Sequence, residues 1–368
     1  MIRLASPDID ESEIAAAAEA LRSGHLVQGP RVAEFERQLA QRLGSPHVAA
    51  VSNGTAALHI ALLALNIRPG DKVAVTTFSW PATANVIELC GATPVFIDIE
   101  EQTFGMNAGL LDVALGSDSG IRAIMPVHAF GGMAGMRQIG DVARRYQLPI
   151  VEDAACALGA VLDGRQAGRW GTLGCFSFHP RKAATTGEGG AVVVDDPELL
   201  RQLRILRNHG QDPASPEVDF VTPGFNYRLS EMQAAVGSAQ LAKLDRFIAK
   251  RRELAALYDQ RLAALPVTIP RSLSPEAHVY QSYVVLLPED AASRRKALIA
   301  QLRDMGVETT IGTYHMPLLT YYRNKYGFKS GDFPVSESIA ARALALPMHS
   351  RLTADDIAVV TDALRDVL

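Results

Sequence analysis

The first half of the chain alternates between short apolar runs and longer amphipathic stretches. Between residues 48 and 194 the runs are rich in valine, isoleucine and alanine. They have the length of buried strands, and most of the stretches between them have the length of helices. This alternation is typical of an α/β domain with a mostly parallel sheet. We therefore predict strands at 48–52, 72–76, 94–99, 123–127, 149–152, 175–178 and 191–194.

After residue 195 the pattern becomes mainly helical. A long helix is predicted over residues 230–265, and Pro266 would end it. A strand at 281–287 and a helix at 291–305 follow, and the Thr-x-x-Asp sequence at Thr353 resembles the capping box of a final helix. We predict a large domain over residues 1–249 and a small C-terminal α+β domain over residues 250–368.

Composition and charge narrow the class of protein. The net charge is -4, which gives no electrostatic reason to expect nucleic acid as a partner. Cys90, Cys156 and Cys175 form neither a disulfide framework nor a CxxC metal pattern. The chain also lacks an apolar signal core and an apolar stretch long enough to span a membrane. We therefore expect a cytoplasmic protein without a metal and without a membrane partner.

The segment 176–190 carries the first candidate catalytic group. A predicted strand ends, Ser177, His179 and Lys182 follow, and a glycine-rich stretch then lets the backbone pass close to a bound group. The stretch fails the dinucleotide pattern GxGxxG because Val192 occupies the third small position, and the chain has no GK pair for a phosphate-binding Walker loop. Lys182 is either a cofactor-binding lysine or a solvated surface lysine.

Three other segments place polar or aromatic groups after predicted strands. Asp153 emerges from an apolar strand, where it is either an active-site acid or a helix cap. Gly54 and Thr55 open a helix, whose free N–H groups either bind an anion or are simply capped. Trp80 is either a core residue or a face that stacks on a flat ring. Each signal is weak alone.

Together these groups match what pyridoxal 5′-phosphate (PLP) requires, namely an amine, an acid at the ring nitrogen, a phosphate cradle and a stacking face. An ionised Asp153 would keep the ring nitrogen protonated, so that the ring accepts electrons from a breaking bond. Lys182 would bind the cofactor as a Schiff base and later carry a proton. The residues thus favour a PLP-dependent enzyme.

An ordered set of motifs then makes the chain resemble a known family. The motifs include Gly29-Pro30, Gly54-Thr55-Ala56-Ala57-Leu58, Pro126-Val127-His128, Glu152-Asp153-Ala154-Ala155, Phe176-Ser177-Phe178, Arg207-Asn208-His209-Gly210 and Gly224-Phe225-Asn226-Tyr227-Arg228. This set is similar to the DegT/StrS-type (DegT/DnrJ/EryC/StrS) sugar aminotransferases. The resemblance implies the aspartate-aminotransferase fold, which is PLP-dependent transferase fold type I, and a homodimer.

The resemblance also implies roles for individual residues. Lys182 would be the Schiff-base lysine, and its presence instead of histidine favours transamination over dehydration. Asp153 would be the pyridinium partner and Trp80 the stacking ring. The phosphate would be held by Gly54, Thr55 and Ser177, with Asn226 added from the neighbouring subunit.

Two positions depart from the family pattern. Cys156 replaces the usual glutamine or histidine that hydrogen-bonds the 3′-oxygen of the cofactor, and a thiol is a poorer donor. Near the substrate region the usual His-Tyr-Pro run appears as Tyr314-His315-Met316-Pro317. We expect His179 and His315 to contact the substrate.

The leading hypothesis is a glutamate-dependent aminotransferase that acts on a keto-sugar nucleotide. An aminotransferase for a cyclitol or another ketone would use the same cofactor site. A non-catalytic PLP-binding regulatory protein is disfavoured because no DNA-binding segment is appended. An NAD-dependent epimerase or reductase is disfavoured because no dinucleotide pattern follows the early strands.

Overall fold

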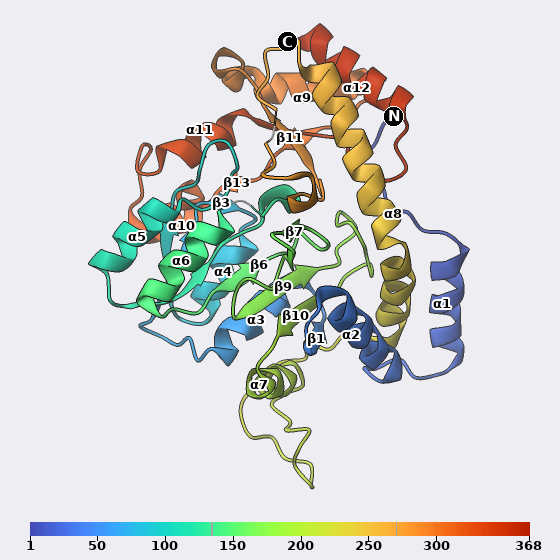
Figure 1. The fold of residues 1–368 in the computed structure, drawn as a ribbon, viewed down its shortest axis with the longest axis vertical. Helices are drawn as coiled ribbons and strands as arrows, with labels where there is room; N and C mark the ends of the chain where they lie inside the picture. The colour runs from blue at the N-terminus through green and yellow to red at the C-terminus, as the bar shows by residue number, and fades with distance from the viewer. Residues whose placement is uncertain (134, 270) are drawn as a thin grey trace.

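A seven-stranded sheet forms the centre of the computed structural model, which describes residues 1–133, 135–269 and 271–368 (Figure 1). Bridges between Ile124 and Ile150 and between Val127 and Asp153 join its two halves. β10 runs antiparallel to both neighbours, and all other neighbouring pairs are parallel. The strand order is β4 (Thr93–Ile97), β2 (Lys72–Thr76), β5 (Ile121–Met125), β6 (Val151–Asp153), β9 (Leu173–Ser177), β10 (Gly190–Val194), β1 (His47–Val51). The predicted strands and the mostly parallel sheet are confirmed, with strand ends shifted by one or two residues.

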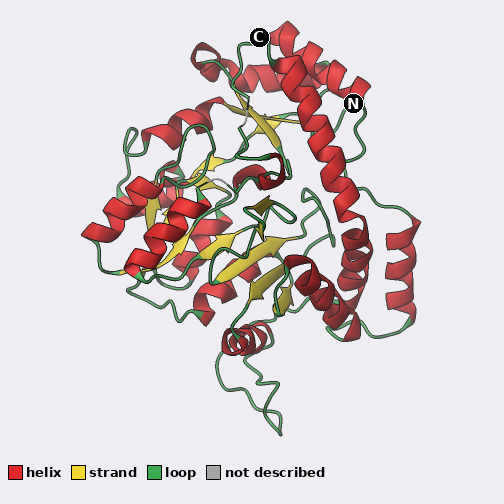
Figure 2. Cartoon of the chain, in the orientation of Figure 1, coloured by secondary structure: helices red, strands yellow, loops and turns green. Residues whose placement is uncertain are grey.

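Both faces of this sheet are buried, which explains why its strands are mostly apolar. Successive side chains of a strand point to opposite faces. In β1, Val48 and Ala50 join one apolar cluster, and Ala49 and Val51 join another. Figure 2 shows the strands enclosed by helices. The first cluster includes α2 (Pro30–Leu43), α5 (Ala108–Ser117), α6 (Met136–Tyr146) and α8 (Glu231–Leu262), and the second includes α3 (Gly54–Ala64), α4 (Ala82–Leu89) and α7 (Pro197–Arg207).

A second, smaller sheet lies in the C-terminal part of the chain. Its order is β11 (Tyr283–Leu286), β14 (Ala343–Leu346), β12 (Thr310–Ile311), and it packs with α9 (Arg295–Asp304) and α12 (Ala354–Val367). β12 and β14 were not predicted. The helix expected at 291–305 instead starts with a 3₁₀ segment, Glu289–Arg294, and becomes α-helical only from Arg295. Ile2 pairs with Val307, so both chain ends lie beside this sheet (Figure 1).

The long helix α8 connects the two parts. It begins with a capping box formed by Ser230 and Gln233 and ends at Leu262, slightly before the predicted end. The division at residues 249 and 250 lies inside this helix and stays a prediction. The remaining regular elements are α1 (Glu11–Arg22), α10 (Thr320–Tyr326), α11 (Pro334–Arg342), β3 (Phe78–Ser79), β7 (Val161–Leu162), β8 (Arg165–Gln166) and β13 (Tyr314–His315). Among the described residues, no helix is both long and apolar enough to cross a membrane.

Candidate active site

Lys182 lies in the loop between β9 and β10, at the carboxyl end of β9. Its backbone N–H donates to the carbonyl of His179 at 2.8 Å, which forms a tight turn. Its side chain is partly buried, and Nζ lies 3.1 Å from Sγ of Cys156. The amine therefore points into the protein at the strand ends, which argues against a solvated surface lysine.

Asp153 ends β6 and is 5% exposed. Its Oδ2 accepts a hydrogen bond from Thr83 Oγ1 at 2.7 Å, and Thr83 Oγ1 lies 2.9 Å from Ser79 Oγ. Its Oδ1 accepts from the N–H of Ala155 at 3.2 Å. Residues 154–160 form turns instead of a helix, so the alternative that Asp153 caps a helix is wrong. The buried carboxylate is held from two sides.

A buried hydrogen-bonded pair, His128 and Glu152, supports the strand that carries Asp153. His128 Nε2 lies 2.7 Å from Glu152 Oε2. The exposed fraction of the side chain is 1% for His128 and 0% for Glu152. The Glu152 carboxylate also accepts the backbone N–H groups of Gly168, Trp170 and Gly171 at 2.8, 2.5 and 2.6 Å. Buried carboxylates require such partners. Thr83, His128 and Glu152 were not predicted from the sequence as supports of Asp153.

The start of α3 lies against the ends of β9 and β10. A side chain at Gly54 would place its Cβ 2.8 Å from Cβ of Ser177, closer than real carbon atoms approach. Asn53 caps the helix by accepting from the N–H of Ala56 at 2.8 Å, so Thr55 is not the cap and its side chain is exposed. The first N–H groups of a helix have no partner within it and favour an anion. Gly54, Thr55 and Ser177 are thus brought together as predicted.

Trp80 follows β3 and is 62% exposed, so the alternative that it is a core residue is wrong. Tyr314 contacts it edge to face, with ring centroids 5.5 Å apart. The contact arises because β13 pairs with β3, which places Tyr314 opposite Ser79. The segment of Tyr314 stood out in the sequence, but Tyr314 itself was not predicted to belong to the site.

The two histidines expected to contact the substrate differ in accessibility. His179 is partly buried and its Nδ1 accepts from the N–H of Arg181 at 3.2 Å. His315 is 9% exposed and its Nδ1 lies 2.9 Å from Ser336 Oγ. Burial lowers the pKa of both imidazoles. Their contact with a substrate stays a prediction, and the burial of His315 favours a role in anchoring β13.

Asn226 lies in the long connection between α7 and α8, which protrudes below α7 in Figure 1. Its side chain is exposed, and its backbone pairs with that of Asn208. The predicted role concerns the phosphate of a neighbouring subunit, so it stays a prediction.

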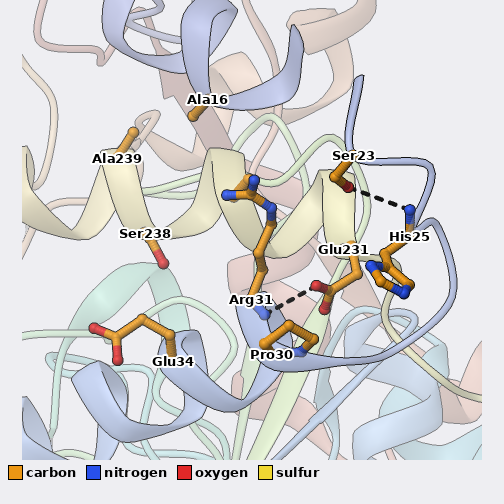
Figure 3. Close-up of a pocket in the computed structure, with 10 residues that line it drawn as sticks. Ala16, Ser23, His25, Pro30, Arg31, Glu34, Glu231, Ser238 and Ala239 are labelled. Atoms are coloured by element: carbon orange, nitrogen blue, oxygen red, sulfur yellow. Dashed lines mark hydrogen bonds between the residues drawn. The ribbon is translucent and has the colours of Figure 1, made fainter. Parts of the chain in front are cut away.

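A separate hollow of about 480 Å³ lies between α1, α2 and α8 (Figure 3). Glu231 is buried beside it and accepts the N–H groups of Gly29, Arg31 and Val32 at 2.8 to 2.9 Å, which caps α2. None of the predicted site residues lines the hollow. We therefore assign it no part in the candidate active site.

The residues at the carboxyl ends of β6 and β9 fit PLP. Lys182 supplies a partly buried amine, and Asp153 supplies a buried carboxylate. Because Gly54 has no side chain, the start of α3 packs directly against Ser177 at the end of β9. In open α/β sheets ligands bind at this edge. The individual contacts to the cofactor, including any contact from Cys156, stay predictions.

Comparison with known proteins agrees with this fit. The chain is 37% identical over 370 residues to GDP-perosamine synthase of Caulobacter vibrioides, a match that covers 100% of this chain and 98% of the relative. It superimposes on DesV of S. venezuelae with a TM-score of 0.89 and 36% identity, covering 96% and 93% of the two chains. It also superimposes on the putative sugar aminotransferase Spr1654 of Streptococcus pneumoniae with a TM-score of 0.94 and 28% identity. The match covers 100% of this chain, and 97% of the PMP form and 99% of the PLP form of that protein.

The expected fold type, cofactor and enzyme class are thereby confirmed. The protein is a PLP-dependent sugar aminotransferase of fold type I, with a mixed α/β architecture. The model of one family matches residues 7–365, nearly the whole chain. The chain therefore belongs to the DegT/DnrJ/EryC1/StrS aminotransferase family.

Proposed function

We propose that the protein transfers an amino group from glutamate to a keto-sugar nucleotide, and that the nucleotide is GDP. The observation that carries the aminotransferase chemistry is the meeting of Lys182 and Asp153 at adjacent strand ends, beside the start of α3. The similarity to GDP-perosamine synthase supports a GDP-linked acceptor. The product would be an amino sugar used in polysaccharide or related biosynthesis.

Lys182 and Asp153 have separate tasks in this proposal. When bound, PLP accepts the electrons of the bond that breaks at the substrate carbon. Lys182 holds the cofactor between turnovers and moves a proton while substrate is bound. Asp153, kept in place by Thr83, holds the proton on the ring nitrogen.

The proposed acceptor site lies beside Trp80. Its exposed ring and that of Tyr314 form one aromatic corner next to β3. His179 would reach the substrate from the loop of Lys182, and His315 would fix the strand that presents Tyr314. Flat aromatic faces suit both a cofactor ring and a sugar nucleotide.

The proposed assembly is a cytoplasmic homodimer with shared active sites. Asn226 would reach the phosphate of the partner chain, because its side chain is exposed while the backbone on both sides of it is tied to the end of α7. Two-fold dimers are the commonest closed assembly. Light scattering of the purified protein at twice the mass of one chain would support this part.

The test of the reaction is an acceptor panel. Purified protein is incubated with PLP, glutamate and either a keto sugar linked to GDP, UDP or dTDP or a cyclitol ketone, and 2-oxoglutarate is measured. We expect it to form with a GDP-linked ketone, and a Lys182→Ala chain should form none. Turnover only with a cyclitol ketone would refute the nucleotide acceptor. If no ketone yields 2-oxoglutarate, the alternative of a non-catalytic PLP-binding regulatory protein would be favoured.

A further inference from the structure

Three aromatic side chains form a cluster behind Asn226, here called the aromatic clamp: His59, Phe225 and Tyr227. The rings of Phe225 and Tyr227 stack with centroids 4.8 Å apart and planes 12° apart. His59 is 6% exposed, its ring centroid lies 5.0 Å from that of Phe225, and its Nδ1 lies 3.2 Å from Tyr227 Oη. Burial lowers the pKa of His59 and raises that of Tyr227, so both partners of this hydrogen bond are neutral.

The clamp determines which way Asn226 faces. Successive side chains in an extended segment point to opposite sides. Because Phe225 and Tyr227 both pack toward His59, Asn226 between them is turned to the other side, where it is exposed. The backbone on both sides is tied down, since the N–H groups of Phe225 and Tyr227 donate to the carbonyls of Leu206 and Arg207 at 2.7 and 3.0 Å.

The clamp also connects this segment to the helix that begins at the proposed phosphate cradle. His59 belongs to α3, whose first residue is Gly54. Five residues of helix correspond to about 7.5 Å along its axis. The carbonyl of Tyr227 accepts the N–H of Ser52, immediately before that helix, at 2.8 Å. One helix therefore touches both the cradle of its own chain and the segment that presents Asn226.

We propose that the aromatic clamp is a positioning device that holds Asn226 for the active site of the partner chain. This inference rests on the proposed shared sites. His59 acts through Phe225 and Tyr227 and has no contact with the reacting atoms. Its loss releases Asn226 and weakens phosphate binding in the other chain, while the cradle in its own chain stays intact.

The alternative is that the clamp is ordinary core packing that supports α3. The two hypotheses differ in which chain of a dimer is affected. Packing under α3 would act on the phosphate site of the same chain, whereas a clamp on Asn226 acts on the site of the partner. A difference between chains cannot arise from a general loss of stability, which affects both sites.

Mixed dimers with two different tags separate these hypotheses. One chain keeps Lys182, and the other carries Lys182→Ala, so that each dimer has a single lysine-containing site. His59→Ala is placed either in the chain with Lys182 or in its partner. PLP binding is titrated by absorbance, and pyridoxal, which lacks the phosphate, is titrated in parallel. Tyr227→Phe provides a milder variant that removes the hydrogen bond and keeps the ring.

We expect His59→Ala in the partner to weaken PLP about tenfold and pyridoxal less than about twofold, because a phosphate contact is lost. The same change in the lysine-containing chain should alter PLP binding less than about twofold. Tyr322→Phe is the matched control: it removes a buried hydroxyl that donates to Asn85 Oδ1 at 2.6 Å, elsewhere in the same apolar cluster. It should show no difference between the two placements.

Asn226→Ala in the same two placements tests the shared site itself. If it weakens PLP only within its own chain, or in neither placement, the shared-site proposal is wrong. If it acts on the partner while His59→Ala acts equally in both placements or only in its own chain, the clamp is wrong and the shared site stands. Weaker PLP binding from the partner placement of both variants supports the inference.

Discussion

The carboxyl edge of the central sheet and the short β3–β13 pair contribute to one site in different ways. At the sheet edge, Asp153 ends β6, and Lys182 and Gly54 follow β9 and β1 within a few residues, so strand pairing brings them together. At the β3–β13 pair, Tyr314 reaches Trp80 only because two residues of a distant segment add to β3. We expect the first region to carry the cofactor chemistry and the second to contact the acceptor, and each region holds one departure from the family pattern, Cys156 beside Lys182 and Tyr314-His315 in β13.

The largest expected effect is at the sheet edge. Lys182→Ala should lower kcat at least about a thousandfold, because no other amine replaces it. The fold should survive, since a partly buried loop lysine contributes little to packing. Lys329→Ala, at an exposed position, is the control with unchanged activity. Borohydride reduction of the holoenzyme followed by peptide mapping should label Lys182, and a label on another lysine would disprove the assignment.

Asp153→Asn should lower kcat about a hundredfold while some PLP is retained, because a neutral amide no longer favours the protonated ring. Thr83→Val should act in the same direction but more weakly, since it removes one hydrogen bond to the Asp153 carboxylate. Steady-state kinetics and the melting temperature are measured together. Loss of thermal stability with normal kcat would show that Asp153 is structural.

At the β3–β13 pair the expected effects are smaller and fall on acceptor binding. Tyr314→Ala should raise KM for the acceptor about tenfold and leave kcat nearly unchanged, because the aromatic corner is lost but the sheet edge is not. Tyr314→Phe keeps the ring and should behave almost as the unaltered protein. Equal losses of kcat in both variants would mean that the β3–β13 pair does not act on acceptor binding alone.

The smallest effect is expected for His315. Burial lowers its pKa and outweighs the attraction of Glu337 and Asp98, so the unfolded chain takes up a proton near pH 6.5 before the folded chain does. Its contribution to stability is therefore present above pH 6.5 and is lost as the pH falls. His315→Asn should reduce the fall in melting temperature between pH 7 and pH 5 by about 2 °C. An unchanged slope, with a large rise in acceptor KM, would favour direct substrate contact.

The same contrast explains how much the sequence predicted. The central strands, α8 and the capping box at Thr353 were predicted because each depends on a local pattern of apolar or capping residues. Lys182, Asp153 and Gly54 could be identified from the sequence because each lies in a short motif at or just after a predicted strand. Thr83, Glu152 and Tyr314 were missed since their partners are far away in sequence, and no periodicity encodes which residues of a two-residue strand will pair.

The continuous helix α8 has a consequence for how the molecule denatures. Its first half packs in the core of the central sheet, and its second half packs with β11, β14 and α12. Between these halves the buried Arg251 donates to the carbonyls of Tyr280, Gln281 and Met348 at 3.0 to 3.1 Å. Melting either half exposes apolar surface of the other and leaves a guanidinium without its acceptors. The two parts should therefore unfold cooperatively, in one calorimetric transition, despite their separate cores.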